Sequence, residues 1–237
     1  MTHPTLILVP GLMCDDTSWG PVLPALSAHM PCRVVSHGNA DSLVAMAQNI
    51  LATAPEQFYL AGHSMGGRVA LEVVRLAPER VLRLALLGTG FRPKEAGAAG
   101  EEEVQKRQAL LDIAHDQGIR QMALTWVQNM VAPSRLNDAA LIEDIVQMFE
   151  RKSEDIFQRQ IKALLERPDA SDVLAEVQVP TLVMAGEFDA WASPQQHQQI
   201  ADLVPTRPTV DVVMGSGHMM MMEKPELVTA SFLSWLQ

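Results

Sequence analysis

The sequence predicts an α/β protein with a mostly parallel, doubly wound sheet of about six strands and a helical lid inserted into it. Apolar runs rich in β-branched residues alternate with helical patterns over residues 1–90. The alternation stops between residues 91 and 172, where only helical patterns occur, and it resumes over residues 173–237. Continuous apolar strands are typical of parallel sheets that helices cover on both faces. We therefore expect a core of residues 1–90 and 173–237, with residues 91–172 as the lid.

Six apolar runs account for the predicted strands. The first, Thr5-Leu6-Ile7-Leu8-Val9, is apolar after its threonine and is stopped by Pro10-Gly11. In chain order, strands are expected at residues 5–9, 32–36, 58–63, 81–87, 181–185 and 209–214. Helices of the core are expected at residues 19–26, with Ser18 as N-cap, at 42–54 and 65–76, before Val204, and at 225–237.

The lid is predicted to contain four helices, bounded by Gly118, Pro133 and Pro168. These helices cover residues 101–115, 118–131, 138–151 and 154–166. Asn137 and Ser153 are expected to cap the last two. Residues 92–100 lack large hydrophobic side chains and hold two glycines, so a flexible linker is expected there.

Charge and hydropathy exclude several classes of function. The chain has 237 residues with 18 basic and 28 acidic side chains, and its net charge of −10 would repel a nucleic acid backbone. No apolar run is long enough to span a membrane, and Met1-Thr2-His3-Pro4 leads into the first strand without a basic segment. We expect a cytoplasmic monomer or homodimer that binds neither nucleic acid nor membrane.

The two cysteines, Cys14 and Cys32, lie in unlike segments and fit no metal-ligand spacing. Free thiols in a reducing compartment and no metal site are therefore expected. Nothing near Cys14 in the sequence resembles an activating base, so we interpret it as packing near a site loop.

The segment Phe58–Arg68 carries the first chemical signal. Its apolar strand ends in Gly62-His63-Ser64-Met65-Gly66 and passes directly into a helical pattern. So sharp a turn pushes its apex side chain outward and strains the apex backbone, and glycines two positions away on either side avoid collisions. Ser64 is therefore the candidate nucleophile.

Two further candidates follow later strands. Asp189 lies in Gly186-x-x-Asp189-x-x-x-x-Pro194 after the fifth strand, and His218 lies in Gly215-x-Gly217-His218 after the sixth. Glu223-x-Pro225 follows the histidine. Because the carboxyl ends of parallel strands share one edge of a sheet, we expect Asp189 and His218 to meet Ser64 there.

These three patterns, in the order serine, aspartate, histidine, resemble the α/β-hydrolase family over residues 5–90 and 178–237. The resemblance implies a triad in which His218 acts as general base and then acid and Asp189 orients it, without metal or organic cofactor. The chemistry needs these residue types, because a serine hydroxyl is a poor nucleophile at neutral pH and must lose its proton to a neutral imidazole during attack.

Two backbone N–H groups are expected to form an oxyanion hole, since the tetrahedral intermediate needs preorganised donors. The first is that of Met65, at the start of the helix after Ser64. By resemblance, the second is that of Leu12 in Pro10-Gly11-Leu12. Many family members have His-Gly where this chain has Pro10-Gly11, so the hydrogen bonds of this loop are open at this point.

Other titratable residues near these positions are weaker candidates. Glu187 shares the loop of Asp189, and Asp211 lies in the last strand, where alternation directs it to solvent. We interpret His63 as structural and His37 as a loop residue near the mouth of the site.

Six residues are candidates for contact with a small-molecule acyl substrate. Trp126, Phe149, Phe157, Trp191 and Met219 could line a pocket between lid and core, although such residues are more often plain core. Ser-Met-Gly-Gly-Arg, which ends at Arg68, resembles the family's enzyme of menaquinone biosynthesis and implies contact of the arginine with a substrate carboxylate. A packing role for Arg68 is the favoured alternative.

We expect a serine hydrolase that cleaves an ester, or a related acyl bond, of a small and rather apolar carboxylic acid through an acyl-enzyme. Arg68 leaves open a C–C lyase or hydrolase of the menaquinone-biosynthesis type. A non-catalytic ligand-sensing protein on the same fold is the third hypothesis, since a fold does not dictate a function.

Overall fold

One six-stranded sheet forms the centre of the computed structural model, which describes residues 4–237. Met1, Thr2 and His3, on which the expectation about the N-terminal segment rested, lie outside the described residues. The strand order is β2-β1-β3-β4-β5-β6, and every neighbouring pair is parallel. The predicted parallel sheet is confirmed. The strands are β1 (Thr5–Val9), β2 (Cys32–Val34), β3 (Phe58–His63), β4 (Val81–Leu87), β5 (Thr181–Gly186) and β6 (Val210–Val213).

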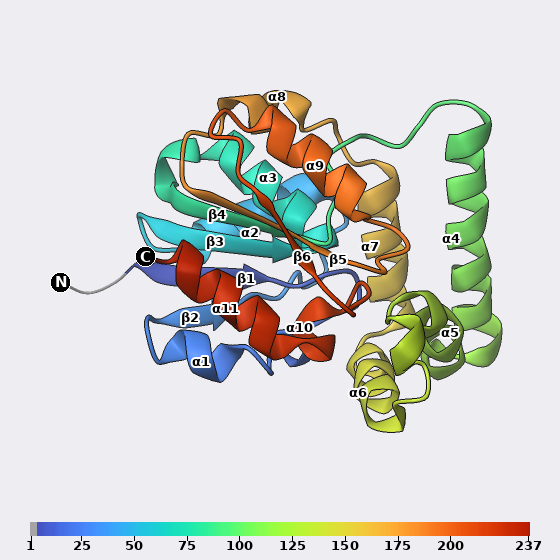
Figure 1. The fold of residues 1–237 in the computed structure, drawn as a ribbon. Coiled ribbons are helices and arrows are strands. Elements are labelled where there is room, and N and C mark those ends of the chain that lie inside the picture. The colour runs from blue at the N-terminus through green and yellow to red at the C-terminus, as the bar shows by residue number, and fades with distance from the viewer. Residues whose placement is uncertain (1–3) are drawn as a thin grey trace.

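Helices cover both faces of the sheet (Figure 1). Along β1, Leu6 and Leu8 pack on one face with Phe232, whereas Ile7 and Val9 pack on the other, as the alternation of side chains along a strand requires. The first face carries α1 (Leu23–Ser27), α10 (Met220–Glu223) and α11 (Pro225–Trp235), and the second carries α2 (Leu43–Thr53), α3 (Met65–Leu76), α8 (Ser171–Glu176) and α9 (Pro194–Leu203).

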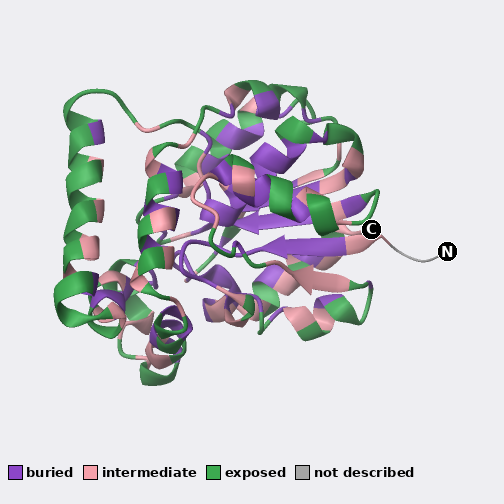
Figure 2. Cartoon of the chain, turned by 180° about the vertical axis from the view of Figure 1, so that it is seen from behind, coloured by how far each residue is buried: buried purple, intermediate pink, exposed green. Residues whose placement is uncertain are grey.

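The segment between β4 and β5 is helical, as expected, and residues 91–172, all of which the structure describes, contain no strand. Figure 1 shows this segment at the carboxyl ends of the strands, whereas the C-terminus lies at the opposite end of the sheet. Its α4 is exposed along most of its length (Figure 2), with only Gly100 and Ala114 buried. The helices are α4 (Ala98–Gln117), α5 (Ile119–Trp126), α6 (Ala139–Glu150) and α7 (Glu154–Leu165).

The first core helix starts later than expected, and Ser18 is not its N-cap. Asp15 instead caps a 3-10 turn at Asp16–Ser18 by accepting a hydrogen bond from the Thr17 amide. The α-helix begins only at Leu23, because Pro24 lacks an N–H and fits only the first turn of a helix.

Two starts in the inserted segment also differ from expectation. Asp138, not Asn137, caps α6, because its carboxylate accepts from the Leu141 amide. The helix expected from residue 101 begins at Ala98, after Gly97 at a φ of 68°. Ser153 caps α7 as predicted.

The turn between β3 and α3 is constrained from both sides. Ser64 has a φ of 57° and a ψ of −119°, which is strained for a residue with a Cβ atom. A Cβ atom at Gly62 would lie 2.2 Å from the carbonyl oxygen of Gly66, and one at Gly66 would lie 2.1 Å from that of Val9. The start of α3 is therefore packed against the ends of β1 and β3, and Ser64 stands at the sheet edge.

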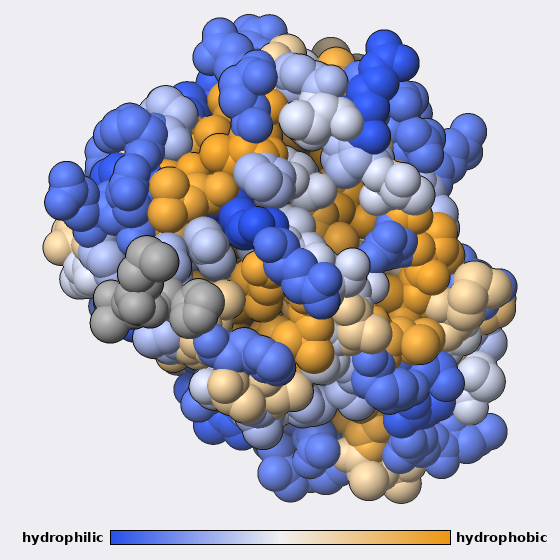
Figure 3. Space-filling view, turned by 60° about the vertical axis from the view of Figure 1, so that its left-hand side comes forward, coloured by the Kyte–Doolittle hydropathy of each residue, from blue (hydrophilic) through white to orange (hydrophobic). Residues whose placement is uncertain are grey.

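Exposed hydrophobic side chains are scattered over the molecule. On the face shown in Figure 3, hydrophobic areas are interrupted by hydrophilic residues. Phe188 and Trp191, which flank Asp189, are among the large hydrophobic residues that are exposed. None of the helices within residues 4–237 is long and apolar enough to cross a membrane.

Substitution of Gly66 tests the packing of this turn. In Gly66→Ala the new Cβ atom would overlap the Val9 carbonyl, so the free energy of unfolding should fall by about 3 kcal/mol or more. Gly38→Ala is the control, because Gly38 has a φ of 54° with nothing within 4 Å of a Cβ atom, and should lose only about 1–2 kcal/mol. Urea denaturation measures both, and equal losses would contradict the packing argument.

Candidate active site

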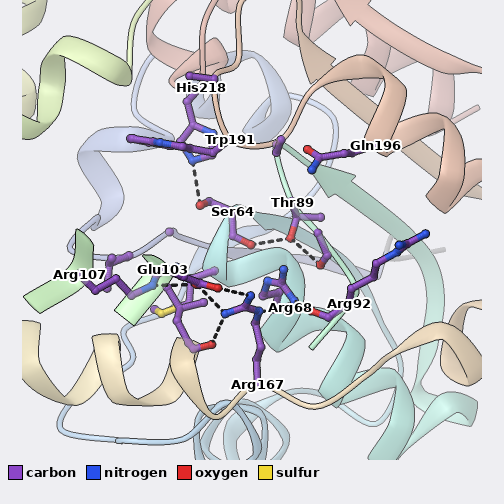
Figure 4. Close-up of a pocket in the computed structure, with 18 of the residues that line it drawn as sticks. Ser64, Arg68, Thr89, Arg92, Glu103, Arg107, Arg167, Trp191, Gln196 and His218 are labelled. Carbon is purple, nitrogen blue, oxygen red and sulfur yellow. Dashed lines mark hydrogen bonds and ion pairs between the residues drawn. The ribbon is translucent and has the colours of Figure 1, made fainter. Parts of the chain in front are cut away.

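Ser64, Asp189 and His218 come together at the carboxyl edge of the sheet, after β3, β5 and β6. His218 Nε2 lies 2.8 Å from Ser64 Oγ, and His218 Nδ1 lies 2.7 Å from Asp189 Oδ2. Figure 4 shows the imidazole of His218 directed at the hydroxyl group of Ser64. The structure therefore brings the three predicted residues into one hydrogen-bonded chain.

Asp189 is held by the turn that follows β5. Its Oδ1 accepts hydrogen bonds of 2.9 Å from the amides of both Trp191 and Ala192, which leaves Oδ2 for His218. Burial acts to raise the pKa of Asp189, but the charge and hydrogen bond of His218 and the two backbone N–H groups outweigh it and hold the pKa below its usual value. The carboxylate is therefore charged and directs His218 Nδ1–H toward itself.

The rival acids make other contacts. Glu187 accepts a hydrogen bond of 2.8 Å from the amide of Gly215, in the loop that carries His218. Asp211 is half-buried within β6 and does not line the cavity at Ser64. Among these carboxylates, only Asp189 is hydrogen-bonded to His218.

The backbone of His218 is fixed as firmly as its ring. Its amide donates to the Met130 carbonyl at 2.8 Å, and its carbonyl accepts from His63 Nε2 at 2.8 Å. Burial, followed by the neighbouring His218, lowers the pKa of His63 to about 3, so His63 is neutral and donates through Nε2–H. His63 is therefore structural, as interpreted from the sequence, and its partner is the candidate base itself.

The loop after β1 borders Ser64. Leu12 and Met65 line the cavity beside the hydroxyl group, and their amides donate to no other group of residues 4–237. The next amide along, that of Met13, donates to Gln160 Oε1 of α7 at 2.8 Å. The two predicted oxyanion donors are therefore available to a ligand, while their neighbour is occupied.

The hydrogen bonding around Pro10-Gly11 is explained by His37. His37 Nε2 lies 2.8 Å from the Pro10 carbonyl oxygen and holds this peptide in place. His37 is a loop residue, as expected, but its side chain is buried against the loop after β1 and does not line the cavity at Ser64. Burial lowers the pKa of His37 to about 4, so it too is neutral at pH 7.

A cavity of about 570 Å³ opens over Ser64 and His218. Trp126, Trp191 and Met219 line it, as predicted. Phe149 and Phe157 do not, because both are fully buried against Trp126, with 5.6 and 6.0 Å between the ring centroids. The ring of Trp191 meets His218 edge-on at 5.0 Å, so an aromatic wall stands next to the candidate base.

Arginines lie on the other side of Ser64 (Figure 4). Arg68, on α3, donates to the Arg92 carbonyl at 2.9 Å and forms no ion pair with a carboxylate among the described residues. Arg107 and Arg167 both bind Glu103, at 2.8 and 2.7 Å. Burial, and then repulsion by Arg167, lower the pKa of Arg68 to about 9. Three guanidinium groups thus line the cavity near one carboxylate, Glu103, which only Arg107 and Arg167 bind, and this end of the cavity favours an anion.

Several supporting residues were missed from the sequence. Thr89 Oγ1 donates to the Ser64 carbonyl at 2.7 Å, and the Thr89 amide donates to His197 Nε2 at 3.1 Å. Thr89 could have been found, because it follows β4 at the same sheet edge; His197, on α9, gave no such signal. Cys14 lines the cavity with its pKa raised by burial to about 12, so it is a neutral thiol. The described residues hold no group of three or more potential metal ligands.

Comparisons with known proteins agree on the fold. A family model described as "Alpha/beta hydrolase family" matches residues 6–231. A Haemophilus influenzae protein whose name proposes an esterase or lipase is 25% identical over 98% of this chain and 83% of its own length. A pimeloyl-[acyl-carrier protein] methyl ester esterase of Pectobacterium carotovorum is 26% identical over 98% of this chain and 94% of its own. The structure of a thermophilic esterase from Thermogutta terrifontis, with malate bound, has a TM-score of 0.85 and 27% identity, covering 99% of this chain and 90% of that chain.

The two buried neutral histidines predict sensitivity to acid. Above about pH 6.5 both histidines are neutral in the folded and in the unfolded protein, so they do not make the stability depend on pH. Below about pH 6.5 these histidines bind protons in the unfolded chain, whereas His37 and His63 of the folded protein stay neutral down to about pH 4 and 3. Stability should therefore fall with pH from about 6.5 toward 4, by up to about 1.4 kcal/mol per pH unit for each histidine. Urea denaturation across this range measures the slope. His37→Gln, which keeps a donor for Pro10, should reduce it, and an unchanged slope would refute the assignment to His37.

Proposed function

Because the chain belongs to the alpha/beta hydrolase family, we propose that it is a serine hydrolase that cleaves an ester, or a related acyl bond, of a small carboxylic acid. The observation that carries the proposal is the hydrogen-bonded chain from Ser64 Oγ through the imidazole of His218 to Asp189, at 2.8 and 2.7 Å. The esterase and methyl ester esterase among its relatives support an ester as the bond that is cleaved.

In the first half of the reaction, Ser64 Oγ attacks the carbonyl carbon of the substrate while His218 Nε2 takes the hydroxyl proton. Asp189 stabilises the imidazolium that forms and keeps its Nδ1–H in place. The Leu12 and Met65 amides receive the oxyanion, and loss of one such donor costs roughly 3 kcal/mol of transition-state stabilisation in a well-studied hydrolase. His218 then protonates the leaving alcohol, and the acyl group stays on Ser64.

In the second half, His218 takes a proton from water, and the resulting nucleophile attacks the acyl carbon. The tetrahedral intermediate again places its oxyanion at Leu12 and Met65. Collapse releases the carboxylic acid and returns the proton to Ser64. The residues named here and one water molecule are sufficient for this cycle.

The walls of the cavity suggest how a substrate lies. Trp126, Trp191 and Met219 offer contact to an apolar part of the substrate. Arg68 lines the same cavity and lacks a carboxylate partner among the described residues, so we assign it the binding of a negatively charged group on the substrate. The preferred substrate is thus an ester whose acyl part is apolar near the reacting carbon and anionic at its far end.

Arg68 also favours a second candidate function, the lyase or C–C hydrolase chemistry suggested by the sequence. In that case the arginine would hold the substrate during the cleavage itself. Aryl esters would then be poor substrates, and substitution of Arg68 would reduce the turnover of every true substrate. An esterase should lose activity only toward esters that carry the anionic group.

Ser64→Ala tests the nucleophile. Removal of the hydroxyl group should lower kcat for short-chain aryl esters by at least about 1,000-fold, because the acyl-enzyme cannot form. Mass spectrometry of the wild-type protein, quenched during turnover, should show the acyl group on the peptide that contains Ser64. Unchanged turnover by folded Ser64→Ala would refute the mechanism. Tight retention of a small ligand without any turnover by the wild-type protein would favour the ligand-sensing hypothesis.

Arg68→Met tests the anionic end of the substrate. For a monoester of a dicarboxylic acid, kcat/KM should fall by about 10- to 100-fold, the range expected for one charge-assisted hydrogen bond. The neutral diester of the same acid should change by less than about threefold. Arg159→Met, which removes an exposed arginine paired with Asp155 on α7, is the matched control. Equal losses on both esters would contradict the assignment.

A further inference from the structure

Glu223 is a buried carboxylate that the triad chemistry does not use, only 3% exposed. From its contacts we infer that Glu223 is a positioning residue for His218, and that residues 130–132 of the inserted segment are a fixed part of the active site rather than of a movable lid. The inference rests on the proposed function, because it assigns His218 the role of base.

The carboxylate of Glu223 joins two separate stretches of backbone. Its Oε1 accepts a hydrogen bond of 2.9 Å from the amide of Gly217, the residue before His218. Its Oε2 accepts one of 2.7 Å from the amide of Ala132, in the inserted segment. Both oxygens are therefore occupied, and each is bound to a different side of the contact between core and insertion.

Met130 also connects the inserted segment to the loop of His218. Its carbonyl accepts from the amides of both His218 and Met219, at 2.8 and 3.2 Å. Two backbone hydrogen bonds thus link the loop of His218 directly to Met130, and Glu223 makes a third link by accepting from Gly217 on one side and from Ala132 on the other. We call this set of contacts the His-loop clamp.

The backbone around the His-loop clamp is closely packed. A Cβ atom on Gly217 would lie 2.6 Å from the Val131 carbonyl carbon and 2.7 Å from the Ala132 nitrogen. On the other side, a Cβ atom on Gly186 would lie 2.0 Å from the Gly217 carbonyl oxygen. The loop before His218 is therefore held between the end of β5 and residues 130–132.

The chemistry of Glu223 fits a role in positioning His218 better than a role in stabilising the fold. Burial raises its pKa in spite of the N–H groups that it accepts from, so burial of this carboxylate opposes its charged form. The nearby Arg135 binds the backbone carbonyl of Glu223, at 2.6 Å, and pairs with Asp138 instead of this carboxylate. Two acceptor oxygens on one side chain are what the Gly217 and Ala132 amides require, and glutamine would supply only one.

The clamp restricts how a substrate can enter. If residues 130–132 moved away, the His218 and Met219 amides would lose Met130, and the Ala132 amide would lose Glu223, whereas the Gly217 amide would keep it. Each buried amide left without a partner costs about 1–3 kcal/mol. Opening at α4, which is exposed along most of its length and whose Glu103 lines the cavity and pairs with Arg167, would break none of these contacts.

Glu223→Gln and Glu223→Ala test the clamp against Glu226→Gln, an exposed carboxylate three residues later on α11. In Glu223→Gln, kcat should fall by about 10- to 100-fold with KM within about threefold, because misplacement of the base affects the chemical step more than binding. Glu223→Ala, which retains no acceptor, should lose more. Glu226→Gln should retain wild-type kcat.

Hydrogen–deuterium exchange provides a readout that needs no turnover. Peptides covering residues 130–132 and 217–219 should exchange faster together in both Glu223 variants, while β1 and α3 stay protected. The low-field proton resonance of His218 Nδ1–H should weaken or shift at the same time. These two measurements separate failure of the clamp from failure of the proposed hydrolase activity.

Three results would overturn the inference while the proposed function stands. The first is wild-type kcat in folded Glu223→Gln, and the second is a rise in KM alone. The third is faster exchange at residues 217–219 without any change at residues 130–132. If Glu223→Ala does not fold, Glu223→Gln decides the question alone, with circular dichroism as the check on its fold.

Discussion

The close contact between α3 and the end of β1 is the constraint on which the rest of the site depends. Gly66 lies so near the Val9 carbonyl that a Cβ atom there would sit 2.1 Å from its oxygen. This contact brings the first amide of α3 and the loop after β1 to the same side of Ser64. Ser64 itself has a strained φ of 57°. A strained residue persists only where its surroundings determine it, and here they also place Leu12 and Met65 where an oxyanion would form.

Next to Ser64, the candidate base His218 is held by hydrogen bonds to its backbone as well as to its ring. His218 is fixed at its amide by Met130, at its carbonyl by His63 and at Nδ1 by Asp189. Two of these partners come from the core, His63 at the end of β3 and Asp189 in the turn after β5, and one comes from the inserted segment. Insertion and core are therefore joined at the active site.

The sheet and the convergence of Ser64, Asp189 and His218 could be predicted because both rest on local signals. Apolar runs mark buried parallel strands, and the ends of parallel strands meet at one edge whatever the distance in sequence. The residues whose positions were not predicted depend on tertiary packing instead. Phe149 and Trp126 both lie in helical patterns, and only packing decides which of them reaches the cavity. His37 is buried and bonded to the Pro10 carbonyl across 27 residues, and Glu223 binds Ala132 across 91 residues, which no spacing rule reveals.

The central claim is that Ser64 Oγ is the nucleophile and that the Leu12 and Met65 amides receive the oxyanion. A crystal structure of the protein after reaction with an aryl phosphonate, a mimic of the tetrahedral intermediate, tests it most directly. We predict continuous density from Ser64 Oγ to phosphorus, with the phosphoryl oxygen within about 3 Å of both amide nitrogens. An adduct on another residue, or a phosphoryl oxygen turned away from both amides, would contradict this account.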